Sequence, residues 1–162
     1  MLCEKILGSR ADFPGETADY VTVEWHERRK KLHRKTSANG ADIAIRLGDN
    51  ERGLRQDDVI GIEGDTVYTV DIPAFEVLRI TITDGHRYAV ETVCWETGNR
   101  HIPLFLGEDE GEFLIPWDDP LEKLLEKIHG IKTEKMICKV DFSREISGGE
   151  SRREHHEHHH GH

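Results

Sequence analysis

The sequence lacks long apolar runs and an excess of basic charge, and each absence excludes a class of protein. No run approaches the roughly 20 apolar residues that span a bilayer, so we expect no transmembrane helix and no membrane partner. Residues 1–5 lack the basic and then apolar composition of a signal peptide, which predicts a cytoplasmic protein. The net charge of −10 repels a phosphate backbone and argues against nucleic acid as a partner.

Paired cysteines are also missing. Cys3, Cys94 and Cys138 are odd in number and far apart, and no CxxC pair occurs. Neither a disulfide framework nor a thiolate zinc site is therefore expected. The same holds for catalytic motifs, because the sequence has no GxSxG, no glycine-rich phosphate loop and no HExxH. We expect a protein without enzymatic activity of its own.

Residues 1–72 predict a small β-rich domain. A run of β-branched and aromatic residues from Asp19 to Trp25 is typical of a strand. Two further short strands flank Glu63-Gly64-Asp65, which predicts a hairpin. The only basic cluster, residues 26–35, is either a strand edge protected by charge or a docking surface for an acidic partner protein.

Residues 74–142 predict a second domain with the order β-α-β-β-α-β, the split βαβ pattern of ferredoxin-like folds. The first helix is expected from a cap at Asp84 to Thr97. The second is expected to begin with a cap at Asp119 and to end at Gly130. The fold class is thus α+β, with residues 143–162 as a flexible, histidine-rich tail that has no apolar anchor after Ile146.

The stretch Gly98-Asn99-Arg100-His101 marks the most informative point of the second domain. Glycine reaches the left-handed backbone conformation easily, so Gly98 is expected to end the first helix. His101 then lies on a short exposed turn between a helix and a strand, as a candidate metal ligand or general base. Because no nucleophile or acid accompanies it in the sequence, the ligand interpretation is favoured.

The tail supplies a metal-binding context, because six of the eleven histidines lie in the last eight residues. An expression tag is one explanation, but Glu157 and Gly161 interrupt the run and favour a native sequence. Neutral imidazole suits nickel, zinc and copper, and a flexible chain can wrap several ions weakly. The candidate metal ligands are therefore His101 and the tail histidines His155, His156, His158, His159, His160 and His162.

These features together resemble the UreE family of urease accessory proteins, which are nickel metallochaperones. The resemblance rests on Gly98-Asn99-Arg100-His101 with Pro103 two residues on, and on the histidine-rich end. It is supported by Trp25-x-x-Arg28-x-Lys30, by Leu54-x-x-x-Asp58-Val59 and by the start of the second helix at residues 118–121. One departure is Pro116-Trp117-Asp118-Asp119, where some members carry extra histidines, so that Asp118 is at most a weak oxygen ligand.

The resemblance implies a homodimer in which the second domains meet head to head. It implies that His101 from each subunit binds one Ni²⁺ ion at the two-fold axis, with Zn²⁺ or Cu²⁺ able to replace it in vitro. It further implies delivery of Ni²⁺ to the urease apoprotein, together with other urease accessory proteins including a GTPase. An N-terminal domain similar to a peptide-binding module is part of the same expectation.

Three alternatives remain open at this point. The first is a general nickel or zinc storage protein without a urease client. The second is a hydrolase with a metal ion on His101, although the sequence offers no acid or base for it. The third is a peptide-binding chaperone that works through Trp25 and the basic cluster, with an incidental metal tail.

Overall fold

The structure, a computed structural model, describes residues 1–48, 50, 52–83 and 86–146. The chain divides into two compact units, Met1–Ala74 and a second that begins at Phe75. The fold is α+β as expected, with β-sheets in the first unit and a sheet carrying two helices in the second. Among the described residues, no helix has the length and apolar character needed to cross a membrane.

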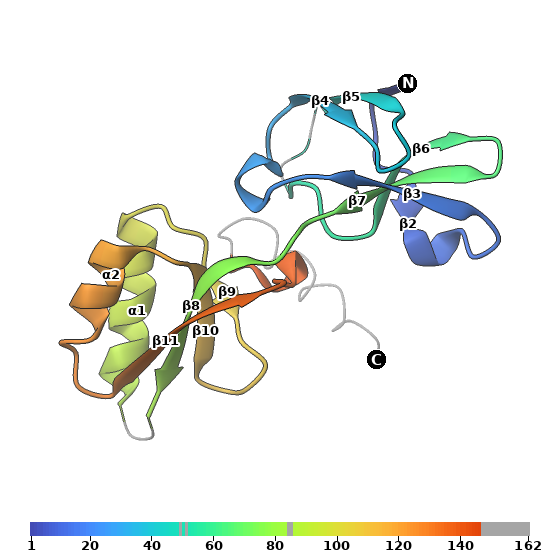
Figure 1. Ribbon diagram of the computed structural model, residues 1–162. Coiled ribbons are helices and arrows are strands. Elements are labelled where there is room, and N and C mark those ends of the chain that lie inside the picture. The colour runs from blue at the N-terminus through green and yellow to red at the C-terminus, as the bar shows by residue number, and fades with distance from the viewer. Residues whose placement is uncertain (49, 51, 84–85, 147–162) are drawn as a thin grey trace, which may run out of the picture. The chain divides into compact units, whose positions relative to one another are not determined.

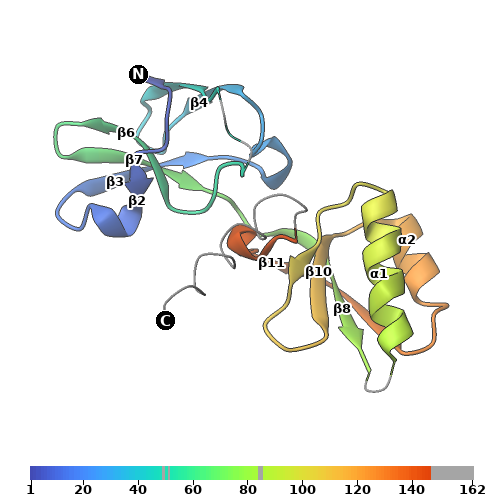
Figure 2. The ribbon, with the colours of Figure 1, turned by 180° about the vertical axis from the view of Figure 1, so that it is seen from behind.

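The first unit contains a three-stranded and a four-stranded sheet. The smaller sheet has the order β1-β5-β4, with β1 at Leu2–Cys3, β5 at Asp42–Arg46 and β4 at Leu32–Thr36. The larger has the order β2-β6-β7-β3, with β2 at Gly8–Ser9, β6 at Asp58–Glu63, β7 at Thr66–Asp71 and β3 at Thr17–Thr22. Figure 2 shows β3 beside β7, to which it is paired in parallel.

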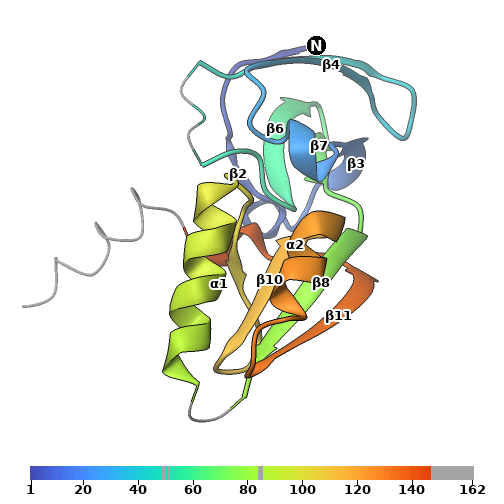
Figure 3. The ribbon, with the colours of Figure 1, turned by 90° about the vertical axis from the view of Figure 1, so that its left-hand side faces the viewer.

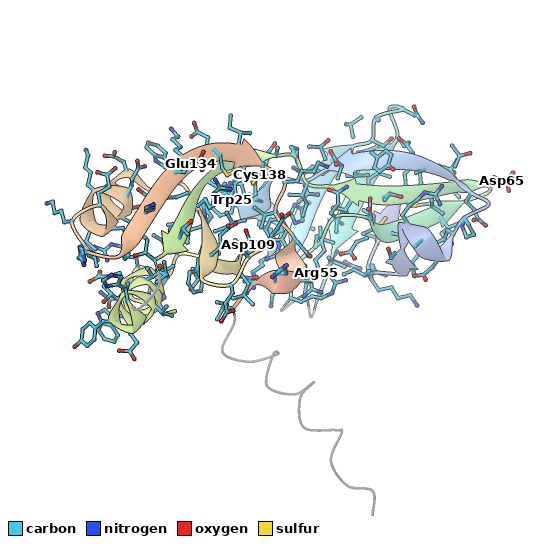
Figure 4. The ribbon with its side chains drawn as sticks, turned by 90° about the horizontal axis from the view of Figure 1, so that it is seen from below. Trp25, Arg55, Asp65, Asp109, Glu134 and Cys138 are labelled. Carbon is cyan, nitrogen blue, oxygen red and sulfur yellow. The ribbon has the colours of Figure 1, made fainter. Side chains whose placement is uncertain are left out.

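The expected hairpin is confirmed in the larger sheet. Strands β6 and β7 pair antiparallel and are joined by Gly64 and Asp65, with Gly64 at a φ of 59°. A positive φ at this point is what a two-residue hairpin turn requires, and glycine adopts it without steric cost. Asp65 lies at the exposed tip of the hairpin (Figure 4).

The strand expected to reach Trp25 ends earlier. β3 stops at Thr22, and Trp25 opens a short 3₁₀ turn, η2, at Trp25–Glu27. Trp25 has the composition typical of a strand, but it lies beyond the point where the backbone turns. Because the amide of Glu27 donates to the carbonyl of Glu24 at 2.9 Å, the chain closes a turn here instead of continuing along the sheet.

The basic cluster, residues 26–35, is partly a structural element. Strand β4 lies at the edge of the smaller sheet, as the charged-edge interpretation predicts. Two members are buried, however. The guanidinium of Arg28 donates to the carbonyl of Leu54 at 3.0 Å, and the ring of His33 donates to the carbonyl of Lys30 at 2.9 Å. A hydrogen bond from Lys35 to Glu27 at 2.6 Å lowers the pKa of that carboxyl to about 2.

The second unit follows the expected β-α-β-β-α-β order. Its elements are β8 at Phe75–Ile82, α1 at Arg87–Asn99, β9 at Phe105–Leu106, β10 at Glu112–Pro116, α2 at Asp119–Leu125 and β11 at Ile131–Cys138. The sheet order is β11-β8-β10-β9 with antiparallel neighbours. Strands β8 and β9 therefore run in the same direction with β10 between them, which is the split βαβ arrangement.

Both helices cover one face of this sheet, side by side (Figures 1 and 3). The core between helices and sheet is formed by the buried apolar residues Leu78, Ile80, Val93, Leu104, Phe113, Ile115, Leu121 and Leu125. Full burial of each such side chain contributes roughly 1.5–3 kcal/mol. This core fixes helix α1 and, through Leu104, the segment that follows it.

Helix α2 begins one residue earlier than expected. Asp118, and not Asp119, is the N-cap, since its carboxylate accepts the amide of Leu121 at 2.8 Å. Pro120 consequently lies at the second helical position. The helix ends at Leu125 and not at Gly130 as expected, because a turn separates it from Gly130, which has a φ of 89°. The cap expected at Asp84 lies outside the described residues.

The described chain ends against the free edge of the sheet. The ring of Phe142 is buried and lies 5.4 Å from that of Phe105 and 6.3 Å from that of Phe75. Phe105 forms an antiparallel bridge with Glu145, and the amide of Ile146 donates to Leu104 at 2.7 Å. Residues 143–146, expected in the tail, thus pack beside β9, and the rest of the tail lies outside the described residues.

Candidate metal-binding turn

The candidate site is the turn that ends α1, and its backbone differs from the expectation in one respect. Gly98 does not end the helix, because α1 continues through Asn99 and Arg100 is the C-cap. The residue in the left-handed conformation is His101 itself, at a φ of 55°. The prediction that Gly98 is the left-handed residue was wrong, because the sequence alone does not show how far the helix continues past the glycine.

The turn has the hydrogen bonds of a Schellman motif. The amide of His101 donates to the carbonyl of Gly98 at 3.0 Å, and that of Ile102 donates to Thr97 at 3.1 Å. Ile102 then packs against the core of the second unit, and Pro103 follows it. The backbone on both sides of His101 is therefore fixed.

Histidine is an unusual residue for this position. The left-handed conformation costs a non-glycine residue of the order of 1–2 kcal/mol, which glycine would avoid. Such conformations cluster at functional sites, which makes the side chain of His101 a candidate for a function. The side chain of His101 is exposed to solvent, so its imidazole is available to a ligand from outside the protomer.

The described residues around His101 form no multi-ligand cluster with it. Within the described part of the chain, no group of three or more His, Cys, Asp or Glu side chains could hold an ion together. The nearest charged neighbour in sequence, Arg100, is bound by an ion pair to Glu96 one turn back along α1. One protomer therefore offers a single ordered imidazole at this turn.

The outer face of α1 carries two large aromatic residues. Tyr88 is 83% exposed and Trp95 is 68% exposed, and they are seven residues apart, which places them on one face of the helix. The opposite face is buried through Ala89, Val93 and Thr97. Exposed aromatic residues that share a face are typical of an interaction surface.

The histidines outside the turn and the tail behave differently from one another. His26 is exposed in η2, whereas His33 is buried and its pKa is lowered, chiefly because burial disfavours the charged ring. His86 and His129 contact each other, with ring centroids 4.7 Å apart. No local sequence pattern links these two residues, which are 43 positions apart.

Asp118, a possible weak oxygen ligand from the sequence, has a structural role as the N-cap of α2. One carboxylate oxygen is used to cap α2. The neighbouring Trp117 donates its indole N–H to Glu122 at 2.5 Å. This segment is organised around the start of the helix.

The tail ligands His155, His156, His158, His159, His160 and His162 lie outside the described residues. The structure does, however, locate the point from which the tail departs. Ile146 is hydrogen-bonded to Leu104, which is only three residues from His101. The described chain therefore ends close to the candidate turn.

Comparison with known proteins covers both units. Residues 3–72 match the N-terminal domain, and residues 76–162 the C-terminal domain, of the UreE urease accessory protein. The chain is 36% identical over 150 residues to the urease accessory protein UreE of Helicobacter pylori (strain G27), covering 91% of this chain and 86% of that protein. It is 37% identical over 142 residues to the protein of the same name from Acetivibrio thermocellus, covering 86% and 89%. For the Helicobacter acinonychis protein of that name the identity is 35% over 150 residues, covering 91% and 86%. The chain belongs to the family of UreE urease accessory proteins.

Proposed function

We propose that the protein is a nickel-binding metallochaperone that takes part in urease maturation. It delivers Ni²⁺ to apo-urease during metallocentre assembly in the cytoplasm, together with other urease accessory proteins including a GTPase. The observation that carries this proposal is His101, an exposed imidazole held in a left-handed conformation by a Schellman motif.

The ion is bound between two copies of the chain. A nickel ion takes more ligands than one imidazole provides. A two-fold axis close to His101 brings a second copy of the same imidazole to the ion without any additional residue in the sequence. A homodimer in which the two His101 side chains share one ion is thus the simplest arrangement that gives the ion two ordered imidazole ligands.

The outer face of α1 suits the contact between the two copies. Tyr88 and Trp95 lie on this face, and α1 ends two residues before His101. Burial of an aromatic side chain removes 150–250 Å² from water, so two such residues contribute substantially to a dimer interface. The turn that holds the proposed ligand follows directly after the same helix.

Tail histidines complete the coordination sphere. Ile146, the last described residue, is bonded through its amide to Leu104. His155 is nine residues farther along, and an extended chain of that length spans about 30 Å. The anchored start therefore keeps the tail imidazoles at a high effective concentration around His101 of the same dimer. Such ligands exchange readily, which a carrier needs in order to release its ion.

The ion proposed is Ni²⁺, and imidazole also binds Zn²⁺ and Cu²⁺ in vitro. The three cysteines are all free thiols, as expected in a reducing compartment. UreE accessory proteins are non-enzymatic, so the prediction that the chain has no catalytic activity is confirmed by its family.

Calorimetric titration of the full chain with Ni²⁺ tests the central site. We expect His101→Ala to remove the ion of highest affinity, one per dimer, while the circular dichroism spectrum stays unchanged. His26→Ala, which replaces an exposed histidine of the first unit, is the matched control and should leave the titration unaltered. Unchanged high-affinity binding in His101→Ala would overturn the proposal.

Urease activation separates delivery from storage. A cell that carries His101→Ala in place of the native chain should mature its urease poorly at low external Ni²⁺ and recover at high Ni²⁺. A storage protein without a urease client would instead change the total cellular nickel and leave the fraction of active urease at a given nickel content unaffected.

A further inference from the structure

Two histidines outside the proposed central site meet at the other end of the second unit. His86 immediately precedes α1, and His129 lies in the turn between α2 and β11. Figure 3 shows that the start of α1 and the turn leading to β11 lie at the same end of the sheet. The two rings have centroids 4.7 Å apart and planes at 85° to each other.

This separation suits two imidazoles that share a metal ion. A ligating nitrogen lies about 2.0–2.1 Å from a zinc ion, and the ring centroid lies about 1.1 Å beyond it. Two rings on adjacent coordination positions, about 90–110° apart, therefore have centroids about 4.5–5.3 Å apart. The observed 4.7 Å falls in this interval, so the two rings are at a separation that a shared ion would require.

The loop around the pair is shaped to accept the ring of His86. A Cβ atom at position 130 would lie 2.4 Å from Cγ of His86, and Gly130 has a φ of 89°. Only glycine fits this combination without strain or displacement of the ring. The atoms of His86 that approach Gly130 are Cβ, Cγ and Cδ2, so the contact does not involve its ring nitrogens.

The two loops are also tied together by the backbone. The carbonyl of Gly130 accepts the amide of Thr83 at 2.9 Å and the hydroxyl of Thr83 at 3.2 Å. His86 and His129 are consequently presented by segments that are already fixed to each other. His129 is exposed and His86 is half-buried, so an ion can reach the pair from solvent.

We propose that His86 and His129 form a second binding site for a divalent transition metal of the kind that imidazole prefers, such as Zn²⁺ or Ni²⁺. Water molecules complete the coordination sphere. Helix α1 separates the pair from His101 by its full length, roughly 20 Å at 1.5 Å per residue. The two sites therefore bind independently. With two protein ligands, this site is weaker than one with three or four.

The test uses the full-length ¹⁵N-labelled protein and Zn²⁺ as the probe, with the imidazole nitrogens followed by NMR. We expect one nitrogen of His86 and one of His129 to shift together during the titration, with the same apparent dissociation constant. His129→Gln should abolish the response of His86, while His101→Ala and the control His26→Ala should leave it intact. Amide spectra report whether each variant remains folded.

A second variant keeps both histidines and changes only their placement. Gly130→Ala forces the ring of His86 away, so the shared response should weaken at least tenfold while His101 binds as before. The proposal is wrong if neither ring shifts at millimolar Zn²⁺, or if the two rings give different dissociation constants. It is also wrong if the response of His86 survives His129→Gln. Each of these outcomes would leave only a contact between the two rings. The result does not depend on a role in urease maturation.

Discussion

The backbone amide of Ile146 donates to the carbonyl of Leu104 at 2.7 Å, and this hydrogen bond connects the end of the described chain to the segment that follows the candidate site. It extends the sheet beyond β9 by one short antiparallel contact, which also includes Phe105 and Glu145. His101 lies three residues before Leu104, so the last described residue is bonded to the segment that follows the proposed metal ligand.

Phe142 attaches the last described residues of the chain to the second unit. Its ring is 3% exposed and contacts the rings of Phe75 and Phe105. We expect Phe142→Ala to lower the free energy of unfolding by about 3–5 kcal/mol, the range found for buried phenylalanine. Urea denaturation measures this loss. Ile146→Ala, at a largely exposed side chain, should change stability by less than about 0.5 kcal/mol.

We expect the number of bound ions to depend on the tail, and a truncation after Ile146 tests this. Ending the chain there keeps the packed residues 142–146 and removes all six tail histidines. We expect fewer Ni²⁺ ions per dimer in a calorimetric titration, with the ion on His101 still bound but more weakly. Loss of all binding in this truncated protein would place the metal site in the tail alone.

Two substitutions at His101 separate the effect of backbone strain on stability from the effect of the imidazole on nickel binding. His101→Gly removes the imidazole and relieves the left-handed backbone, whereas His101→Ala removes the imidazole and retains the strain. We expect the glycine variant to be more stable than the alanine variant by about 0.5–1 kcal/mol, measured by thermal unfolding. Both variants should lose the high-affinity nickel ion. Equal stability of the two variants would mean that the strain is no larger than the additional backbone entropy that glycine loses on folding.

The proposed dimer can be disrupted at its helix. Trp95→Asp places a charge on the outer face of α1 and should convert the dimer to a monomer at micromolar concentration, as seen by analytical ultracentrifugation. Ile137→Asp on β11 is a matched control, since Ile137 is 69% exposed against 68% for Trp95. If both variants remain dimeric, the interface lies elsewhere on the molecule.

Buried His33 makes stability dependent on pH. Its pKa is lowered in the folded state, chiefly by burial, so the unfolded chain binds a proton more readily. The stability from its neutral form is complete above the unfolded pKa of about 6.5 and falls as the pH drops from there towards the folded pKa. We expect His33→Gln to flatten the decline in unfolding free energy below pH 6.5. An unchanged pH profile would assign the decline to other groups.

Variants of Asp118 test whether its side chain only caps helix α2 or also binds a metal ion. Its side chain accepts the amide of Leu121 at 2.8 Å. Asp118→Ala should lower the free energy of unfolding by about 1 kcal/mol, and Asp118→Asn should restore it, because asparagine caps equally well. Nickel titrations of both variants should match that of the unaltered protein. Weaker nickel binding in the asparagine variant would reveal a carboxylate ligand.

Much of the fold was accessible from local patterns. Alternation of apolar residues and the Gly64-Asp65 turn located the hairpin β6–β7, and the order of strand and helix patterns in the second unit gave the split βαβ arrangement. The errors concern boundaries. Trp25, Gly98 and Asp119 were each misplaced by one to three residues, because a local pattern does not show which backbone carbonyl will accept the next amide.

Residue types and their spacing were enough to predict an acidic α+β protein with a conspicuous histidine on a turn and a cluster of histidines at its end. Local chemistry suffices for this, since residue type and spacing along the chain are enough to infer it. Three further features came only from the folded chain: His101 itself adopts the left-handed conformation, His86 contacts His129, and Ile146 binds beside β9. The first depends on where the hydrogen bonds of α1 end, and the other two depend on the packing of segments that are distant in sequence.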